Sequence, residues 1–77
     1  MTAEVRKLRA RLTEVERQIH ELEARLEEIG AALADPTLYT DGDRVRAITS
    51  ERKSAEERVA WLMREWEDLS TELSAHE

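Results

Sequence analysis

The side chains in this sequence that are best suited to chemistry are basic residues that could hold phosphate groups. Arg44 and Arg46 form the most compact positive pair, and Tyr39, a few residues earlier, carries a ring that can stack on a base. Lys53 and Arg17 are expected at outward helix positions, from which they could reach phosphates. These five residues are the candidate contacts for DNA or RNA.

The same charges also fit a solvated helix surface on which basic and acidic side chains pair with one another. Exposed pairs of this kind contribute only about 0–1 kcal/mol each and require no ligand. The formal net charge of −6 also opposes nonspecific binding to a phosphate backbone. The residues alone therefore leave both interpretations open.

No pattern of residues indicates a catalytic or metal site. The chain has no cysteine, and His20 and His76 each lack a second ligand at a useful helical spacing. The sequence contains no Gly-x-x-x-x-Gly-Lys-Ser/Thr loop that would hold ATP phosphates. Many of its carboxylates line the predicted helices, and we expect a hairpin to have no cleft that would tune their acidity. We therefore expect no enzyme activity, no cofactor and no metal.

Two heptad seams must position these side chains. The chain is 40% hydrophobic and 39% charged, which is typical of a coiled coil. In each seam the steps of three and four residues alternate without a break. The first seam consists of Val5, Leu8, Leu12, Val15, Ile19, Leu22, Leu26, Ile29 and Leu33. The second consists of Val45, Ile48, Arg52, Ala55, Val59, Leu62, Trp66, Leu69 and Leu73.

A turn separates the two seams. Thr2 and Asp41 are the expected N-caps of the two helices, and Pro36 can open a helix of one turn between them. Leu38 and Tyr39 would then fold over the open end of the hairpin. The connection is too short to let the helices lie parallel, so we expect them to pair antiparallel.

The sequence therefore predicts an all-α fold, a two-helix antiparallel coiled-coil hairpin. It fills residues 1–77 as one unit, with the first helix at about 3–34, the turn at about 35–41 and the second helix at about 42–75. Charge favours this orientation, because the basic start of the first helix lies beside the acidic end of the second. Two ion pairs are expected across the g positions, Arg11 with Glu65 and Arg25 with Glu51.

Two registers of the seams fit the sequence. In the first, Trp66 lies opposite Val15, and Ala55 lies opposite Leu26. In the second, one helix is shifted by one heptad. We prefer the first register because it uses both helices almost to their ends. Trp66 is expected to fill the core, and Arg52, a polar break in the seam, is expected to fix the register.

Trp61 and Met63 are candidate contacts for a protein partner. Trp61 falls at a c position, which should face water, and with Met63 it is expected to form a small apolar patch. Simple packing over neighbouring side-chain stems is the other explanation. Because a two-helix seam buries its residues only partly, the hairpin would gain stability by forming a homodimer or by docking on a larger partner.

The segments ADPTLYTDGDRVRAI and REWEDLSTEL resemble the C-terminal domain of ABC-F ATPases of the Uup type. That domain is a two-helix antiparallel coiled coil with an Asp-Pro-x-Leu-Tyr turn and an Arg-Trp-Glu-x-Leu segment late in its second helix. The matching positions are Asp35, Pro36, Leu38 and Tyr39, then Trp66, Glu67 and Leu69. Two positions depart from the family: Glu65 replaces an Arg, which weakens the nucleic-acid interpretation locally, and Gly42 replaces a Pro.

The resemblance implies a non-catalytic accessory module that helps a parent ABC ATPase to engage nucleic acid. Domains of this family are described as DNA-binding, and the parent proteins act around ribosomes. The parent's ATPase domains would be partners if the chain is part of a longer protein. A structural or dimerising hairpin without nucleic-acid binding is the alternative. The sequence has no apolar run near the roughly 18 residues of a membrane span and no signal-peptide core, so we expect a cytoplasmic protein.

Overall fold

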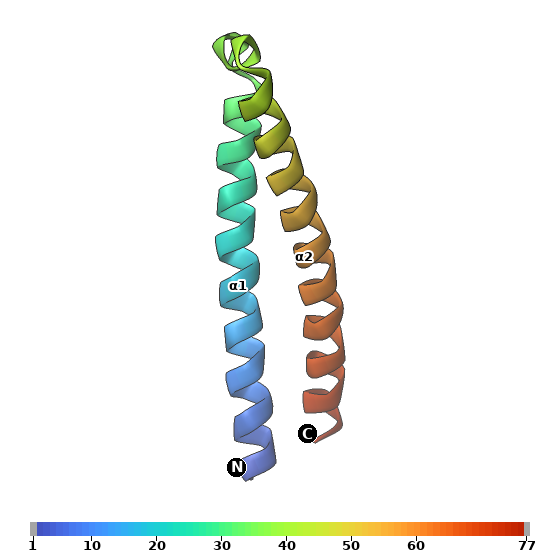
Figure 1. Ribbon diagram of the computed structural model, residues 1–77. Coiled ribbons are helices and arrows are strands. Elements are labelled where there is room, and N and C mark those ends of the chain that lie inside the picture. Colours follow the sequence, from blue (N-terminus) through green and yellow to red (C-terminus); the bar gives the residue numbers. More distant parts are fainter. Residues whose placement is uncertain (1, 77) are drawn as a thin grey trace.

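The computed structural model describes residues 2–76 and shows two long helices folded back on each other (Figure 1). Helix α1 spans Ala3–Leu33, the short 3₁₀ helix η1 spans Pro36–Thr40, and α2 spans Gly42–Ala75. The start of α1 and the end of α2 lie at one end of a rod measuring 56 × 14 × 14 Å, and η1 lies at the other. The predicted fold class, an all-α antiparallel helical hairpin, is confirmed.

Side-chain caps begin all three helices. The Thr2 hydroxyl accepts a hydrogen bond from the Val5 amide at 3.1 Å, which satisfies an amide that has no partner inside α1. The Asp41 carboxylate caps α2 in the same way, at 3.1 Å from the Arg44 amide. Asp35 caps η1, with Pro36 at the first helical position. The caps expected from sequence and the one-turn helix at Pro36 are confirmed.

Helix η1 closes one end of the hairpin with a single apolar side chain. Leu38 is only 9% exposed and packs beneath the turn, as expected. Tyr39 differs from the expectation, because 58% of its surface is exposed. Its hydroxyl still reaches back and donates a hydrogen bond to the Leu33 carbonyl at 2.6 Å, one of the carbonyls left unpaired at the end of α1. The side chain is therefore anchored at its hydroxyl although Tyr39 is largely exposed.

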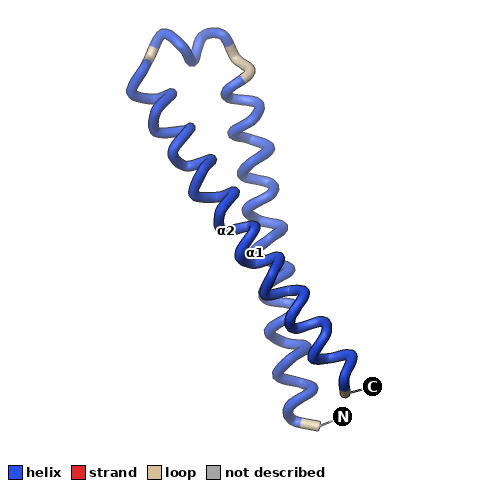
Figure 2. Tube along the Cα trace, turned by 90° about the vertical axis from the view of Figure 1, so that its right-hand side faces the viewer, coloured by secondary structure: helices blue, strands red, loops and turns tan. Residues whose placement is uncertain are grey.

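The core follows the contact between the two helices and consists of two buried clusters. The first is formed by Val15 and Ile19 of α1 with Leu62 of α2, and both Val15 and Leu62 are 0% exposed. The second lies beside the turn and contains Ile29, Leu38 and Ile48. Figure 2 shows α2 crossing α1 in the view turned by 90°. Each cluster draws its side chains from both arms of the hairpin, so it holds the two helices together.

The structure corrects the role of Trp66. The preferred register placed it in the core opposite Val15, but Trp66 is 39% exposed and Leu62, one turn earlier, joins the buried cluster with Val15. All the buried seam residues of α2 are d positions, namely Ile48, Ala55 and Leu62. Helix α2 is therefore rotated so that its d positions face α1 and its a positions lie at the edge of the seam. The large indole is accommodated at that edge, where part of it contacts water.

Ion pairs close one side of the seam, which we call the g edge. Arg11 donates from Nε and Nη2 to both carboxylate oxygens of Glu65 at 2.8–3.0 Å. Arg25 donates to Glu51 at 2.6 and 2.8 Å. Both pairs expected across the g positions are confirmed. Because all four side chains are partly exposed, the pairs favour the antiparallel alignment more than they add stability.

Two further arginines of α2 differ in whether they contact α1. Arg58, at a g position, donates a hydrogen bond across the seam to Gln18 at 3.3 Å. Arg52, the polar break in the seam, instead pairs with Glu56 of its own helix at 2.9 Å, and its side chain is 54% exposed. Arg52 therefore forms no ion pair or hydrogen bond with α1 among residues 2–76 that would fix the register as expected.

Substituting Leu62 with Ala tests this core. Leu62→Ala is expected to lower the free energy of unfolding by about 2–5 kcal/mol, because it leaves a cavity in a fully buried cluster. Urea unfolding followed by far-UV circular dichroism measures the change. The control is Leu26→Ala, which truncates a half-buried seam residue and should cost less. A larger loss for Trp66→Ala than for Leu62→Ala would contradict the observed packing and favour the predicted placement of Trp66 in the core.

Candidate nucleic-acid interface

The tip of the hairpin, residues 35–46, carries three of the five candidate nucleic-acid contacts. Arg44 lies in the first turn of α2 and lines an open depression of about 260 Å³ between η1 and the ends of the two helices. The depression is also lined by Ala32, Asp35, Thr37, Leu38 and Asp41. Arg46 follows Arg44 on α2, and the exposed ring of Tyr39 projects from η1. The tip thus combines an aromatic face with basic side chains.

The tip is not uniformly positive, because its helix caps are aspartates. Asp35 accepts hydrogen bonds from the backbone amide and the hydroxyl of Thr37 at 3.0 and 2.9 Å. These bonds hold the pKa of Asp35 below its ordinary value, so the carboxylate stays charged. Asp41 lines the same depression. Both acids therefore lie beside Arg44 and reduce the positive potential there.

Arg46 and Arg17 both form ion pairs with acidic residues of their own helices. Arg46 forms an ion pair with Asp43 one turn earlier on α2. Arg17 donates to Glu14 at 2.6 Å and to Glu21 at 2.5 Å, which bracket it on α1. The hydrogen bond with Glu14, followed by the charges of both glutamates, raises the pKa of Arg17 above its ordinary value. A phosphate would have to displace these carboxylates to bind either arginine.

Arg44 and Lys53 are the candidate cations that form no ion pair among residues 2–76. They lie nine residues apart on α2, or about 13.5 Å along the helix axis at 1.5 Å per residue. Arg17 lies on α1, outside the tip. The structure therefore brings Tyr39, Arg44 and Arg46 together, adds Lys53 farther along the same helix, and separates Arg17 from them.

Trp61 and Met63 do not form the single patch expected from sequence. Residues two apart on a helix face different directions. Trp61, 57% exposed, lies under the Arg64 guanidinium at 5.9 Å from the ring centre, and both line a depression with Glu65 and Asp68. Met63 instead lines a groove with Ile19 and Trp66. The two side chains therefore belong to separate surfaces.

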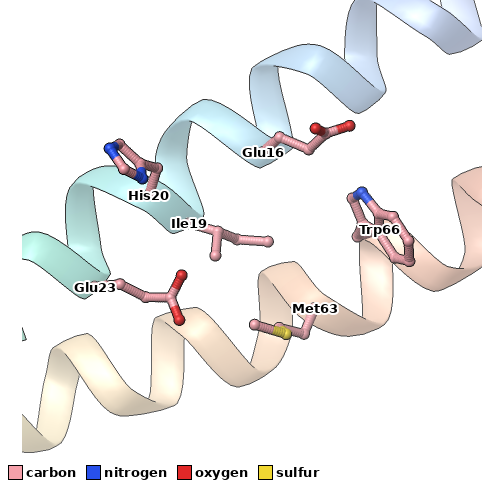
Figure 3. A pocket seen from close by; sticks show the side chains of 6 residues that line it. All are labelled: Glu16, Ile19, His20, Glu23, Met63 and Trp66. Atoms are coloured by element: carbon pink, nitrogen blue, oxygen red, sulfur yellow. The ribbon is translucent and has the colours of Figure 1, made fainter.

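The groove was missed by sequence reasoning. It has a volume of about 470 Å³ and runs along the side of the seam opposite the g edge, which we call the e edge. Figure 3 shows its six lining residues, which are Glu16, Ile19, His20, Glu23, Met63 and Trp66. A signal was present in the sequence, because Met63 is an apolar residue at an e position, where coiled coils favour charged side chains.

The described residues contain no candidate metal site and no membrane-spanning helix. Among residues 2–76, no three His, Cys, Asp or Glu side chains lie close enough together to hold a metal ion. Neither long helix contains an apolar stretch that would cross a membrane.

Comparisons with known proteins place the hairpin in a family. Residues 4–71 match the family described as ABC transporter C-terminal domain. Peptide chain release factor 1 from Anaeromyxobacter sp. (strain Fw109-5) is 38% identical over 64 residues, which cover 83% of this chain. That stretch is only 17% of the release factor, so the chain spans less than a fifth of the length of this relative. No solved structure matches the chain.

Acid should weaken the hairpin through Glu14. Hydrogen bonds from Arg17 and then from Gln18 lower the pKa of Glu14 from 4.5 to about 2 in the folded chain. The unfolded chain therefore takes up the proton at higher pH, and the stabilisation present above pH 4.5 is lost as the pH falls toward 2. Urea midpoints measured across this range should fall less steeply for Glu14→Gln than for the unaltered chain. Glu57→Gln, at an exposed position without an ion pair among residues 2–76, is the control, and an equal flattening by both variants would contradict the assignment.

Proposed function

Because the chain belongs to the ABC transporter C-terminal domain family, we propose that it is a non-catalytic accessory module that contacts nucleic acid through its tip. The family match assigns the chain to the accessory domain of ABC ATPases and not to the ATPase domain itself. Contact with nucleic acid goes beyond this family assignment and is our proposal. It draws on the resemblance of the turn to the ABC-F domain and on the side chains gathered there.

The position of the tip is the observation that carries this proposal. Both long helices run the length of a 56 Å rod, and the tip lies at the end opposite the start of α1 and the end of α2 (Figure 1). An ATPase domain joined to the start of α1 would therefore hold the tip far from its own body. An arm of this shape can reach a nucleic acid that the ATPase itself does not touch.

Three side chains at and near the tip can contribute to binding. Arg44 and Lys53 lie on α2 without ion pairs among residues 2–76, so a phosphate can pair with either without displacing a carboxylate. Tyr39 is 58% exposed, and its hydroxyl is already held by the Leu33 carbonyl. An anchored ring loses little conformational freedom when a base stacks on it. Two phosphate contacts and one stacking contact predict weak binding that depends strongly on salt.

The setting that we propose is cytoplasmic and close to the ribosome. The resemblance to ABC-F proteins implies it, and the similar relative bears the name of a factor for peptide chain release. A dimerising hairpin that uses Trp61 and Met63 together is less favoured, because those side chains lie on separate surfaces. The aspartates of the tip limit the affinity, so the parent ATPase would have to supply additional contacts in a full-length protein.

Removing the two cations that lack ion pairs tests the proposal. Fluorescence anisotropy with a labelled short DNA duplex and a labelled RNA hairpin should detect binding at about 50 mM salt that falls steeply by about 200 mM. The double variant Arg44→Gln/Lys53→Gln should reduce the slope of log affinity against log salt by about 2, because about two phosphate contacts are lost. Tyr39→Ala should weaken binding of the single-stranded loop more than binding of the duplex.

The control for this experiment is Arg17→Gln/Arg46→Gln, which removes the same charge from two arginines already paired with carboxylates. It should change the affinity less than the test variant does. If the unaltered chain binds neither probe at low salt, the proposed function is wrong. If both double variants lose the same affinity, binding reflects total charge and does not depend on the two cations that lack ion pairs.

A further inference from the structure

The groove on the e edge is an apolar surface that the hairpin leaves uncovered. Met63 and Trp66 are 43% and 39% exposed, and they face Ile19 of α1 across a hollow of about 470 Å³. The g edge, on the opposite side of the seam, is covered by the ion pairs Arg11–Glu65 and Arg25–Glu51. The asymmetry arises because α2 turns its d positions toward α1, so its a and e positions line an open edge. The apolar surface of the seam is therefore exposed to water on the e edge and covered by ion pairs on the g edge.

Two acidic side chains flank the groove. Figure 3 shows Glu16 and Glu23 on α1, one on either side of Ile19, with Met63 and Trp66 facing them from α2. Neither glutamate forms an ion pair among residues 2–76. They are seven residues apart, so they occupy equivalent heptad positions about 10.5 Å apart along the helix.

The acidic stretch is limited to the groove itself. One heptad before Glu16, the same edge of α1 carries Arg9, a basic residue. One heptad after Glu23 it carries Gly30, which has no side chain. The two carboxylates therefore mark the two helical turns that border Ile19, and the edge is not acidic along its whole length.

We propose that this groove docks a cationic amphipathic helix of another protein, as the third helix of a short three-helix coiled coil. A large apolar side chain of that helix would fill the hollow between Ile19 and the Met63–Trp66 pair. Lysines or arginines seven residues apart on the docked helix would meet Glu16 and Glu23, since both repeats have the same length. This surface differs from the tip, and its negative charge repels nucleic acid, so the inference does not depend on the proposed function.

Charge argues against a second copy of this chain as the occupant. A twofold dimer buries the same surface of both copies. If the groove lay at the centre of a dimer in which α1 of one copy met α1 of the other, Glu16 and Glu23 of each copy would face the acidic edge of the other. Like charges brought together at an interface are unfavourable, whereas a basic helix neutralises both carboxylates.

Binding of designed peptides tests the inference. The probe is a labelled amphipathic helix of about three heptads, with leucines along one seam and lysines seven residues apart beside it. Its partner probe carries glutamates in place of the lysines. In fluorescence anisotropy the cationic peptide should bind the 77-residue chain at least about tenfold more tightly than the acidic one. In a Trp61→Phe chain, where Trp66 is the remaining tryptophan, binding should also shift its emission to shorter wavelength.

Two double variants separate the groove from general electrostatics. Glu16→Lys/Glu23→Lys should weaken binding of the cationic peptide about tenfold, because two attractive pairs become repulsive. Glu57→Lys/Glu72→Lys makes the same change of charge at exposed positions outside the groove and should change the affinity less than about twofold. All four positions are exposed, so far-UV circular dichroism should show that both variants stay helical.

Four outcomes would overturn the inference. They are failure of the cationic peptide to bind, equal binding of both peptides, equal losses in the two double variants, and evidence that the occupant is a second copy. Sedimentation equilibrium detects the last one, as a dimer that dissociates when Met63→Ser removes the apolar wall of the groove. If the inference is right, Met63→Ser leaves the molecular mass of the chain in solution unchanged and weakens its binding to the cationic peptide.

Discussion

The packing of Leu62 from α2 against Val15 and Ile19 from α1 is the contact on which the rest of the hairpin depends. The two arms of a hairpin this thin have few other places to exclude water, and Val15 and Leu62 are fully buried while most of the chain is exposed. Their contact brings together residues far apart in the sequence, so it fixes both the direction and the rotation of α2. The ion pairs, the tip and the groove all occupy positions that this rotation sets.

Rotation of α2 gives the two sides of the seam different characters. On the g edge, Arg11 and Arg25 reach carboxylates across the helices and cover the apolar contact. On the e edge, no equivalent pair joins the helices among residues 2–76, and Trp66 lies where a polar cover would otherwise be. A symmetric seam would bury both sides equally, whereas this hairpin exposes an apolar groove with acidic borders. A two-helix coiled coil therefore has a free side on which a third helix can be accommodated.

The tip shows how helix capping limits the positive charge that the proposed nucleic-acid contact would need. Asp35 and Asp41 begin η1 and α2 because a carboxylate can satisfy amides that have no partner inside the helices. The same carboxylates place negative charge beside Arg44, and Asp43 forms an ion pair with Arg46. The turn thus gains a defined geometry at the expense of positive potential. An accessory module of this kind would depend on few cations and on an exposed, anchored aromatic ring.

The sequence by itself determined the hairpin, its antiparallel direction and its caps. These features follow from local rules: unbroken heptads form helices, Pro36 and Asp35 interrupt them, and a short connection reverses the chain. The pairs of Arg11 with Glu65 and Arg25 with Glu51 were also predictable, because g positions of antiparallel helices lie beside each other.

Only the tertiary structure decided which face of α2 meets α1. A heptad pattern marks a and d positions alike as apolar, so it does not show that Leu62 is buried while Trp66 lies at the edge. That choice depends on how side chains of different size fit between two particular helices. It also decided that Trp61 and Met63 lie on separate surfaces and that Arg17 and Arg46 are held by carboxylates. The availability of a side chain depends on its neighbours in space, and the order of residues along the chain gives those neighbours only in part.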